Sequence, residues 1–235
     1  DGLPLAIELV ASRIRSLGLD AIARALEKRL VVSTRDVDRP DRQRTLTATV
    51  AWSYDLLGAD LKAAFAQLGL IALAFAALTY GYVTSDFSVE NVWANSHSDK
   101  PLLYKISGVW GNHEGSMLLW VLILALFGAA VAFYGTNLPD SLRANVLAVQ
   151  AGIAVAFLAF IVLASNPFTR IPLQPEGRGL NPILQDPALS FHPRFLYAGY
   201  VGLSIAFSFA VAALIEGRTD AAWARWVRPW TLAAW

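Results

Sequence analysis

The sequence predicts an all-α protein in which a short soluble helical segment precedes four transmembrane helices. Two observations support this prediction. Of the 235 residues, 56% are hydrophobic, which is more than ordinary soluble domains contain. Charge is also uneven, because residues 1–67 hold ten Lys/Arg and nine Asp/Glu, whereas the following 168 residues hold nine of each. We therefore expect a soluble segment over residues 1–66 and a membrane domain over residues 67–235.

The soluble segment is expected to be helical. Residues 4–30 carry apolar side chains at helical spacing, which predicts two short amphipathic helices. The polar stretch 33–44 predicts a linker, and a third helix is expected over 45–57. Gly58, Ala59 and Asp60 then precede a fourth helix that begins near Leu61.

Four uncharged apolar stretches follow, and we expect a membrane span in each, at about 66–83, 116–134, 145–164 and 195–215. A hydrocarbon core about 30 Å thick needs roughly 20 helical residues. A surface helix of a soluble protein would show a polar face, and these stretches have none. The lipid bilayer is therefore a predicted partner.

The connections between the spans predict the orientation. Four spans place two long loops, 84–115 and 165–194, on one side and two short ones, 135–144 and 216–229, on the other. The short loops are richer in arginine per residue, and the positive-inside rule assigns such loops to the cytoplasm. We therefore expect the long loops to face outward, and outer loops held by a rigid bundle are where a site is expected.

Several functions lack any motif. The absence of cysteine excludes a disulfide scaffold, a thiolate metal site and a CxxCH motif within the chain. With a net charge of +1 and no basic stripe, nucleic acid is not a predicted partner. No H-E-x-x-H, G-x-S-x-G, Walker A or G-x-G-x-x-G pattern occurs, so a self-contained enzyme is not predicted. The chain begins at Asp1 without a signal pattern, and we expect a fragment of a longer reading frame.

All three histidines, His97, His113 and His192, lie in the expected outer loops. His192 lies directly before the fourth expected span. Pro193 suits the first turn of a helix, which predicts that His192 lies near the cap of the fourth span. The helix dipole disfavours protonation there, and neutral imidazole is the form that binds a metal. The alternative for His192 is a capping or surface hydrogen bond.

Weaker candidates lie nearby. In the run Trp110–Ser116, two glycines and Glu114 beside His113 indicate a tight turn close to a helix or a flat ligand. The alternative is a polar cap with Trp110 as an anchor at the membrane interface. Arg194 could pair with the propionates of a ligand or with lipid phosphate, and His97 lies in an ordinary polar turn.

Three long motifs resemble the CcmF-type haem lyase subunit of cytochrome c maturation. They are SDFSVENVWANSHSDKPLLYKISGVWGNHEGSMLLWVLIL, GRGLNPILQDPALSFHPRFLYAGYVG and the closing GRTDAAWARWVRPWTLAAW. The resemblance covers residues 68–235. It implies a multi-pass protein of the bacterial inner membrane with periplasmic long loops. It also implies that haem is received from a haem chaperone and positioned for attachment to the CxxCH of an apocytochrome c, alongside other maturation subunits.

The resemblance also implies a site. In that family the histidine of the FHP element is an axial haem ligand, and this role passes to His192 alone. The family's tryptophan-rich haem-presenting loop and its other ligating histidines lie beyond Trp235. We therefore expect weak haem binding and an inactive fragment.

The first 66 residues resemble another family. GLPLAIELVASRIR and RTLTATVAWSYDLLGADLKAAFAQL are similar to the border between the nucleotide-binding core and the winged helix in NB-ARC-type ATPases of bacterial transcriptional regulators. The proline of GLPL, here Pro4, lies against the nucleotide in that family. No phosphate-binding loop accompanies it, so we expect a chimera whose N-terminal part is inactive.

Two alternative functions remain. A transporter or channel fragment would place ionisable residues within the spans, and none is present. A membrane-anchored transcriptional regulator would need a nucleotide site or a complete winged helix. Haem handling in cytochrome c biogenesis is therefore the predicted function.

Overall fold

The computed structural model describes residues 59–217 and 219–235, with side chains from residue 62 onward. Residues Ala63–Trp235 form one compact unit. The described part is helical and contains no strand, apart from one isolated bridge between Val89 and Arg170. The predicted all-α fold is thereby confirmed. The helices expected within residues 1–57, and the resemblance to transcriptional regulators, lie outside the described residues.

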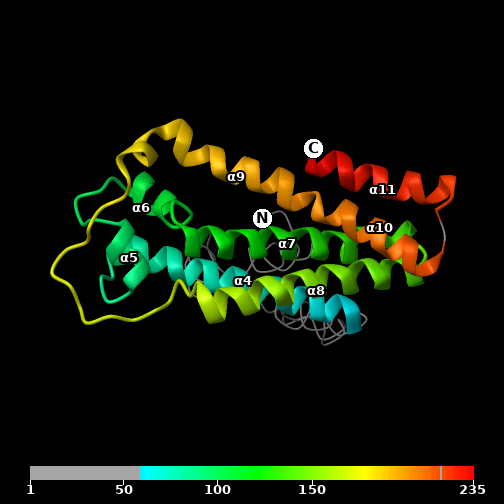
Figure 1. The fold of residues 1–235 in the computed structure, drawn as a ribbon, viewed down its shortest axis with the longest axis horizontal. Helices are drawn as coiled ribbons and strands as arrows, with labels where there is room; N and C mark the ends of the chain where they lie inside the picture. The colour runs from blue at the N-terminus through cyan, green and yellow to red at the C-terminus, as the bar shows by residue number, and fades with distance from the viewer. Residues whose placement is uncertain (1–58, 218) are drawn as a thin grey trace, which may run out of the picture. The chain divides into compact units, whose positions relative to one another are not determined.

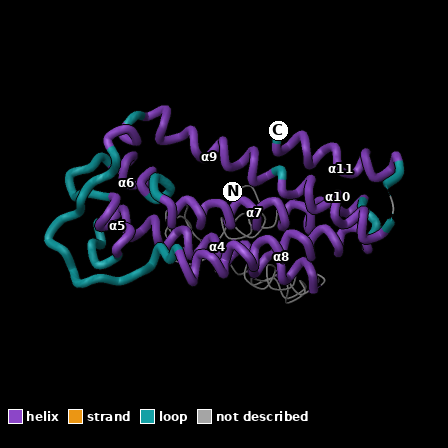
Figure 2. Tube along the Cα trace, in the orientation of Figure 1, coloured by secondary structure: helices purple, strands orange, loops and turns teal. Residues whose placement is uncertain are grey.

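Long apolar helices form the body of this unit. α7, α8 and the pair α9–α10 pack against one another, and α11 returns along α9 and α10 (Figures 1 and 2). Their bounds are α4 Ala59–Thr84, α7 His113–Tyr134, α8 Asp140–Ala164, α9 Pro187–Gly202, α10 Ser204–Glu216 and α11 Ala221–Ala234.

Four membrane spans are predicted, and the described residues contain four candidates. Four helical segments are long and apolar enough to cross a membrane: Lys62–Thr84, His113–Asn137, Asp140–Ala164 and Pro187–Glu216. Their outward surface is apolar, since Leu70 and Leu163 are 68% and 84% exposed. An exposed apolar surface of this extent is typical of contact with lipid rather than with water.

The first span begins earlier than expected. α4 runs from Ala59 to Thr84 without a break, so the helix expected near Leu61 and the span expected from residue 66 are one helix. The residues between them are mostly alanine, lysine and glutamine, which favour helix and provide no stop signal.

The fourth span was also predicted too short. α9 begins at Pro187, eight residues before the expected start, because the side chain of Asp186 accepts a hydrogen bond from the Leu189 amide at 3.0 Å. Asp at the N-cap followed by Pro at the first helical position is a strong start signal. Pro193 lies inside α9 rather than in its first turn, and Leu203 separates α9 from α10.

The last connection is largely helical, which corrects the loop predicted over 216–229. α11 begins at Ala221, where Asp220 caps the helix by accepting from the Trp223 amide at 2.9 Å. Its tryptophan face packs on the buried cluster of α8 and α10, whereas Arg225 and Arg228 are exposed.

Both long loops lie at the same end of the bundle, as predicted (Figure 1). The first contains α5 (Glu90–Asn95) and α6 (Leu102–Gly108), and the second contains the short helix η3 (Pro182–Gln185). Backbone hydrogen bonds join them, from the Glu90 amide to the Thr169 carbonyl at 2.9 Å and from the Arg178 amide to the Trp93 carbonyl at 2.8 Å. We call this paired structure the outer end.

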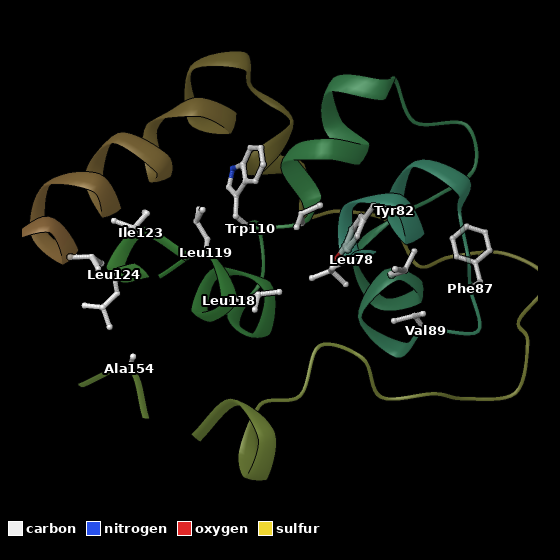
Figure 3. Close-up of a cluster of buried hydrophobic side chains, with 13 residues drawn as sticks. Leu78, Tyr82, Phe87, Val89, Trp110, Leu118, Leu119, Ile123, Leu124 and Ala154 are labelled. Atoms are coloured by element: carbon white, nitrogen blue, oxygen red, sulfur yellow. The ribbon is translucent and has the colours of Figure 1, made fainter. Parts of the chain in front are cut away.

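The outer end shares a hydrophobic core with the spans (Figure 3). One buried cluster combines side chains of α4, α7 and the first long loop, with Ala154 of α8 and Val201 of α9. Its labelled members include Leu78, Tyr82, Phe87, Val89, Trp110, Leu118 and Leu119. The loops are therefore packed extensions of the bundle rather than free segments.

Candidate functional site

His192 lies in the second turn of α9, not at its cap. The helix begins at Pro187, so five helical residues precede the histidine. The field of the helix dipole is felt mainly within the first turn. It therefore gives less reason to expect a neutral imidazole at His192. The side chain is exposed, and within the described residues no protein group binds either ring nitrogen.

An apolar surface surrounds this imidazole. Residues three and four positions away share a helix face, and around His192 these include Leu189, Phe195 and Leu196. They are 40%, 74% and 50% exposed, respectively. A flat apolar molecule could lie along this face of α9. The imidazole nitrogen could then bind a metal ion at the centre of that molecule.

The first turns of α9 are fixed from both sides. The Ser190 hydroxyl donates to the carbonyls of Asp186 at 2.8 Å and Leu184 at 3.1 Å. The indole Nε1 of Trp110 donates to the Ser190 carbonyl at 3.0 Å. These bonds join α9 to the second loop and to the segment before α7, so the position of His192 is set by both long loops.

Trp110 is therefore not the membrane-interface anchor that was the alternative expectation. Its side chain is 7% exposed and belongs to the buried cluster. The Arg194 guanidinium lies 4.7 Å from the Trp110 ring centroid and 4.3 Å from that of Phe191. Such cation–π contacts hold the cation against the aromatic faces. We call Trp110, Ser190 and Arg194 the α9 clamp.

Arg194 and His192 point to different sides of α9. Two residues along a helix are separated by about 200° of rotation. Arg194 accordingly packs inward on Trp110, and its Nε is buried without a hydrogen-bond partner among the described residues. A ligand on the His192 face would thus lie on the other side of the helix from this guanidinium.

His113 is the first residue of α7 and faces the end of α8. Asn112 caps the helix by accepting from the Gly115 amide at 2.8 Å. The His113 Nδ1 lies 2.9 Å from the Ser165 hydroxyl, and its ring meets the edge of Phe160 at a centroid distance of 6.1 Å. The tight turn predicted here therefore brings His113 to a neighbouring helix.

His97 lies where the two long loops meet, next to the hydrogen bonds between Ser98 and Glu176. Its Nδ1 accepts from the Asp99 amide at 3.2 Å and lies 3.9 Å from a Glu176 oxygen. Hydrogen bonds from Ser98 and from the Gly177 amide lower the pKa of Glu176 to about 2. The carboxylate therefore stays ionised at neutral and mildly acidic pH, and its hydrogen bonds with Ser98 join the two loops.

The described residues contain no cluster of three His, Asp or Glu side chains that could hold a metal ion. His192 and His113 stand on different helices with different neighbours. A metal bound by either histidine would therefore need its other ligands from elsewhere.

Comparison with known proteins identifies the family. A family model described as "Cytochrome C assembly protein" matches residues 110–235, which is more than half of the chain. The chain belongs to the cytochrome c assembly family. The matched range includes all four candidate residues, Trp110, His113, His192 and Arg194.

This cytochrome c assembly protein has close relatives of the CcmF type. It is 73% identical over 174 residues to "Cytochrome c-type biogenesis protein ccl1" of Rhodobacter capsulatus, covering 74% of this chain and 27% of that protein. It is 50% identical over 167 residues to "Cytochrome c-type biogenesis protein CcmF" of Escherichia coli, covering 70% and 26%. The chain thus spans about a quarter of the length of these relatives.

A solved structure supports the fold of this cytochrome c assembly protein. "Cytochrome c Heme Lyase CcmF" superimposes with a TM-score of 0.61 at 24% sequence identity, covering 99% of this chain and 31% of that one. The two chains therefore share their helical arrangement.

A polar network at the base of the outer end was missed by sequence analysis. Within this cytochrome c assembly protein the buried Tyr82 hydroxyl donates to Asn91 Oδ1 at 2.6 Å and accepts from Asn112 Nδ2 at 3.0 Å. Asn91 Nδ2 donates to Asn112 Oδ1 at 2.8 Å. The network ties α4, α5 and the α7 cap together. No local pattern predicts it, because its members lie 9 to 30 residues apart.

Proposed function

We propose that this chain handles haem for covalent attachment to apocytochrome c, and that His192 supplies an axial bond to the iron. The observation that supports this most is the exposed imidazole of His192, which lies on an apolar face of α9 and has no hydrogen-bond partner among the described residues. Family membership supports the pathway, since relatives are named cytochrome c-type biogenesis proteins.

The residues present fit haem as a substrate. The face bearing Leu189, Phe195 and Leu196 offers the porphyrin an apolar surface, and His192 offers one nitrogen ligand. The macrocycle supplies the four equatorial ligands that the protein lacks.

The contribution of the chain would be positioning. In thioether formation each thiol adds across a vinyl group, so that a carbon–sulfur bond forms and the thiol hydrogen passes to the neighbouring carbon. The haem carries this chemistry, and His192, held in place by the α9 clamp, would position the vinyl groups where thiols can reach them. The partners this requires are a haem chaperone, an apocytochrome c with CxxCH and other maturation subunits.

The outer end is proposed to lie in the periplasm, on the outer face of the bacterial inner membrane. The opposite end carries Arg143 at the start of α8 and the exposed Arg225 and Arg228 on α11. An excess of arginine beside the spans favours the cytoplasmic side. This orientation places His192 on the side where apocytochromes receive haem.

Titration of the detergent-purified chain with hemin tests the proposal. We expect His192→Ala to weaken the tightest binding phase at least about tenfold, or about 1.4 kcal/mol, and to change the Soret spectrum. His97→Ala is the matched control, because the described contacts of His97 involve Asp99 and Glu176 and no residue of α9, and it should bind as the parent chain does. An unchanged affinity and spectrum in His192→Ala would disprove ligation by this residue.

A further inference from the structure

The outward face of α11 carries two arginines, Arg225 and Arg228, about one helical turn apart. Both are exposed, and neither has a hydrogen-bond or ion-pair partner among the described residues. Side chains at positions i and i+3 are neighbours on a helix surface, where like charges repel each other. The two guanidinium groups therefore form a small positive surface, which an anion from outside the chain would stabilise.

Contacts on the other side of α11 fix this orientation. The Trp223 indole Nε1 donates to the Phe209 carbonyl of α10 at 3.2 Å, and the Trp230 ring stacks on the Phe209 ring at a centroid distance of 6.4 Å. Trp226 and Val227 pack on the same buried cluster of α8 and α10. Because these contacts occupy the inner face of the helix, both arginines are held on the outward face.

The depth of α11 in the bilayer follows from the length of the fourth span. The segment Pro187–Glu216 has 30 residues, so at 1.5 Å per residue it is about 45 Å long, whereas a hydrocarbon core is about 30 Å thick. Its first turns belong to the outer end, where the Trp110 indole donates to the Ser190 carbonyl. The last turns of α10 therefore extend into the headgroup region at the opposite end, and α11 begins at Ala221 and packs beside α10.

Pro229 indicates the same depth independently. Proline has no N–H to donate, so inside α11 it leaves the Arg225 carbonyl without its usual helical donor. Pro229 is exposed on the outward face. An unpaired backbone group is strongly disfavoured in hydrocarbon, because water cannot reach it there. The turn from Arg225 to Pro229 is therefore expected to lie among hydrated headgroups.

We propose that Arg225 and Arg228 bind the phosphate groups of anionic phospholipids in the leaflet at this end of the bundle. The planar guanidinium group matches the geometry of phosphate oxygens, and tryptophans such as those of α11 are typical of the membrane interface. The nearby carboxylates are engaged elsewhere, since Asp220 caps α11 and Glu216 accepts from Asn145 Nδ2 at 3.1 Å. The bound lipid would hold α11 against the fourth span. This inference concerns the membrane rather than haem, and it does not depend on the proposed function.

Thermal unfolding of the full chain in dodecyl maltoside with added phosphatidylglycerol tests the proposal. We expect this lipid to raise the unfolding temperature. The concentration that gives half of the effect should increase at least about tenfold in Arg225→Gln/Arg228→Gln, since each arginine near an anionic surface contributes roughly fivefold in affinity. Arg225→Lys/Arg228→Lys keeps both charges and should keep most of the response. Arg170→Gln is the matched control, because Arg170 is an exposed arginine of the outer end that pairs with Asp86, and it should respond as the parent chain does.

The remaining outcomes decide against the proposal. An equal response of the parent chain and the double Gln variant to phosphatidylglycerol would refute it. Equal stabilisation of the parent chain by phosphatidylcholine would show that no anionic headgroup is recognised, and equal stabilisation by inorganic phosphate would show binding of a free anion instead of a lipid. If circular dichroism and gel filtration show that the Gln variant does not fold, salt provides the test on the parent chain. Added NaCl should weaken its response to phosphatidylglycerol, and a response that salt leaves unchanged would contradict the proposal.

Discussion

Replacing Gly115 by alanine should destabilise the protein more than any other single-methyl change in α7. A Cβ at this position would lie 1.7 Å from the backbone carbonyl oxygen of Val109 and 3.2 Å from Asn112 Oδ1. Backbone cannot swing aside as a flexible side chain can. Val109 is fully buried, so the turn that ends in the α7 cap must open. We expect a loss of about 1–3 kcal/mol from overpacking, plus about 1 kcal/mol if the cap is lost.

Gly128→Ala in the same helix is the matched control. A Cβ at Gly128 meets nothing within 4 Å, and alanine favours helix over glycine by up to about 1 kcal/mol. Thermal unfolding in detergent should therefore show a clear decrease for Gly115→Ala and no decrease for Gly128→Ala. Equal stability of the two variants would show that the 109–115 turn is not packed as described.

Replacing Trp110 by alanine should release the first turns of α9. The substitution removes a buried ring, the hydrogen bond to the Ser190 carbonyl and the surface on which Arg194 packs. Loss of a buried tryptophan side chain costs about 3–5 kcal/mol. Because the α9 clamp fixes the position of His192, we expect hemin affinity to fall together with stability.

Trp110→Phe separates the two contributions. Phenylalanine keeps an aromatic surface for Arg194 but cannot donate to Ser190, and one hydrogen bond is worth about 1 kcal/mol. We expect a small stability loss with mostly preserved hemin binding, measured by thermal unfolding and by titration. If Trp110→Ala unfolds at the temperature of the parent chain, the clamp does not hold α9.

The spans were predictable because their signal is local. Twenty apolar residues without a charge can be recognised in isolation, and each predicted span was found. The error at the start of the fourth span was avoidable, since Asp186 followed by Pro187 is itself a helix-start signal. The start of α11 at Asp220 has a similar cap. Hydropathy alone places neither boundary, whereas the capping residues mark both.

The site was less predictable because its contacts join distant residues. His113 meets Ser165 across 52 positions, and Trp110 meets Ser190 across 80. Nothing in either local sequence specifies the partner. The apolar surroundings of His192, by contrast, follow from helical spacing once α9 is known to begin at Pro187. The assignment of His192 itself came from family resemblance rather than from its local sequence.

The proposed role requires that the outer end, with the start of α9, faces the periplasm. The described residues and the rest of the sequence contain no cysteine, so a single introduced thiol reports one position. Leu173→Cys would lie in the exposed second loop of the outer end, and Thr136→Cys in the exposed short connection after α7. In intact cells, a membrane-impermeant maleimide should label Leu173→Cys, whereas Thr136→Cys should react only after the membrane is permeabilised. Labelling with the opposite preference would place His192 in the cytoplasm and contradict the account.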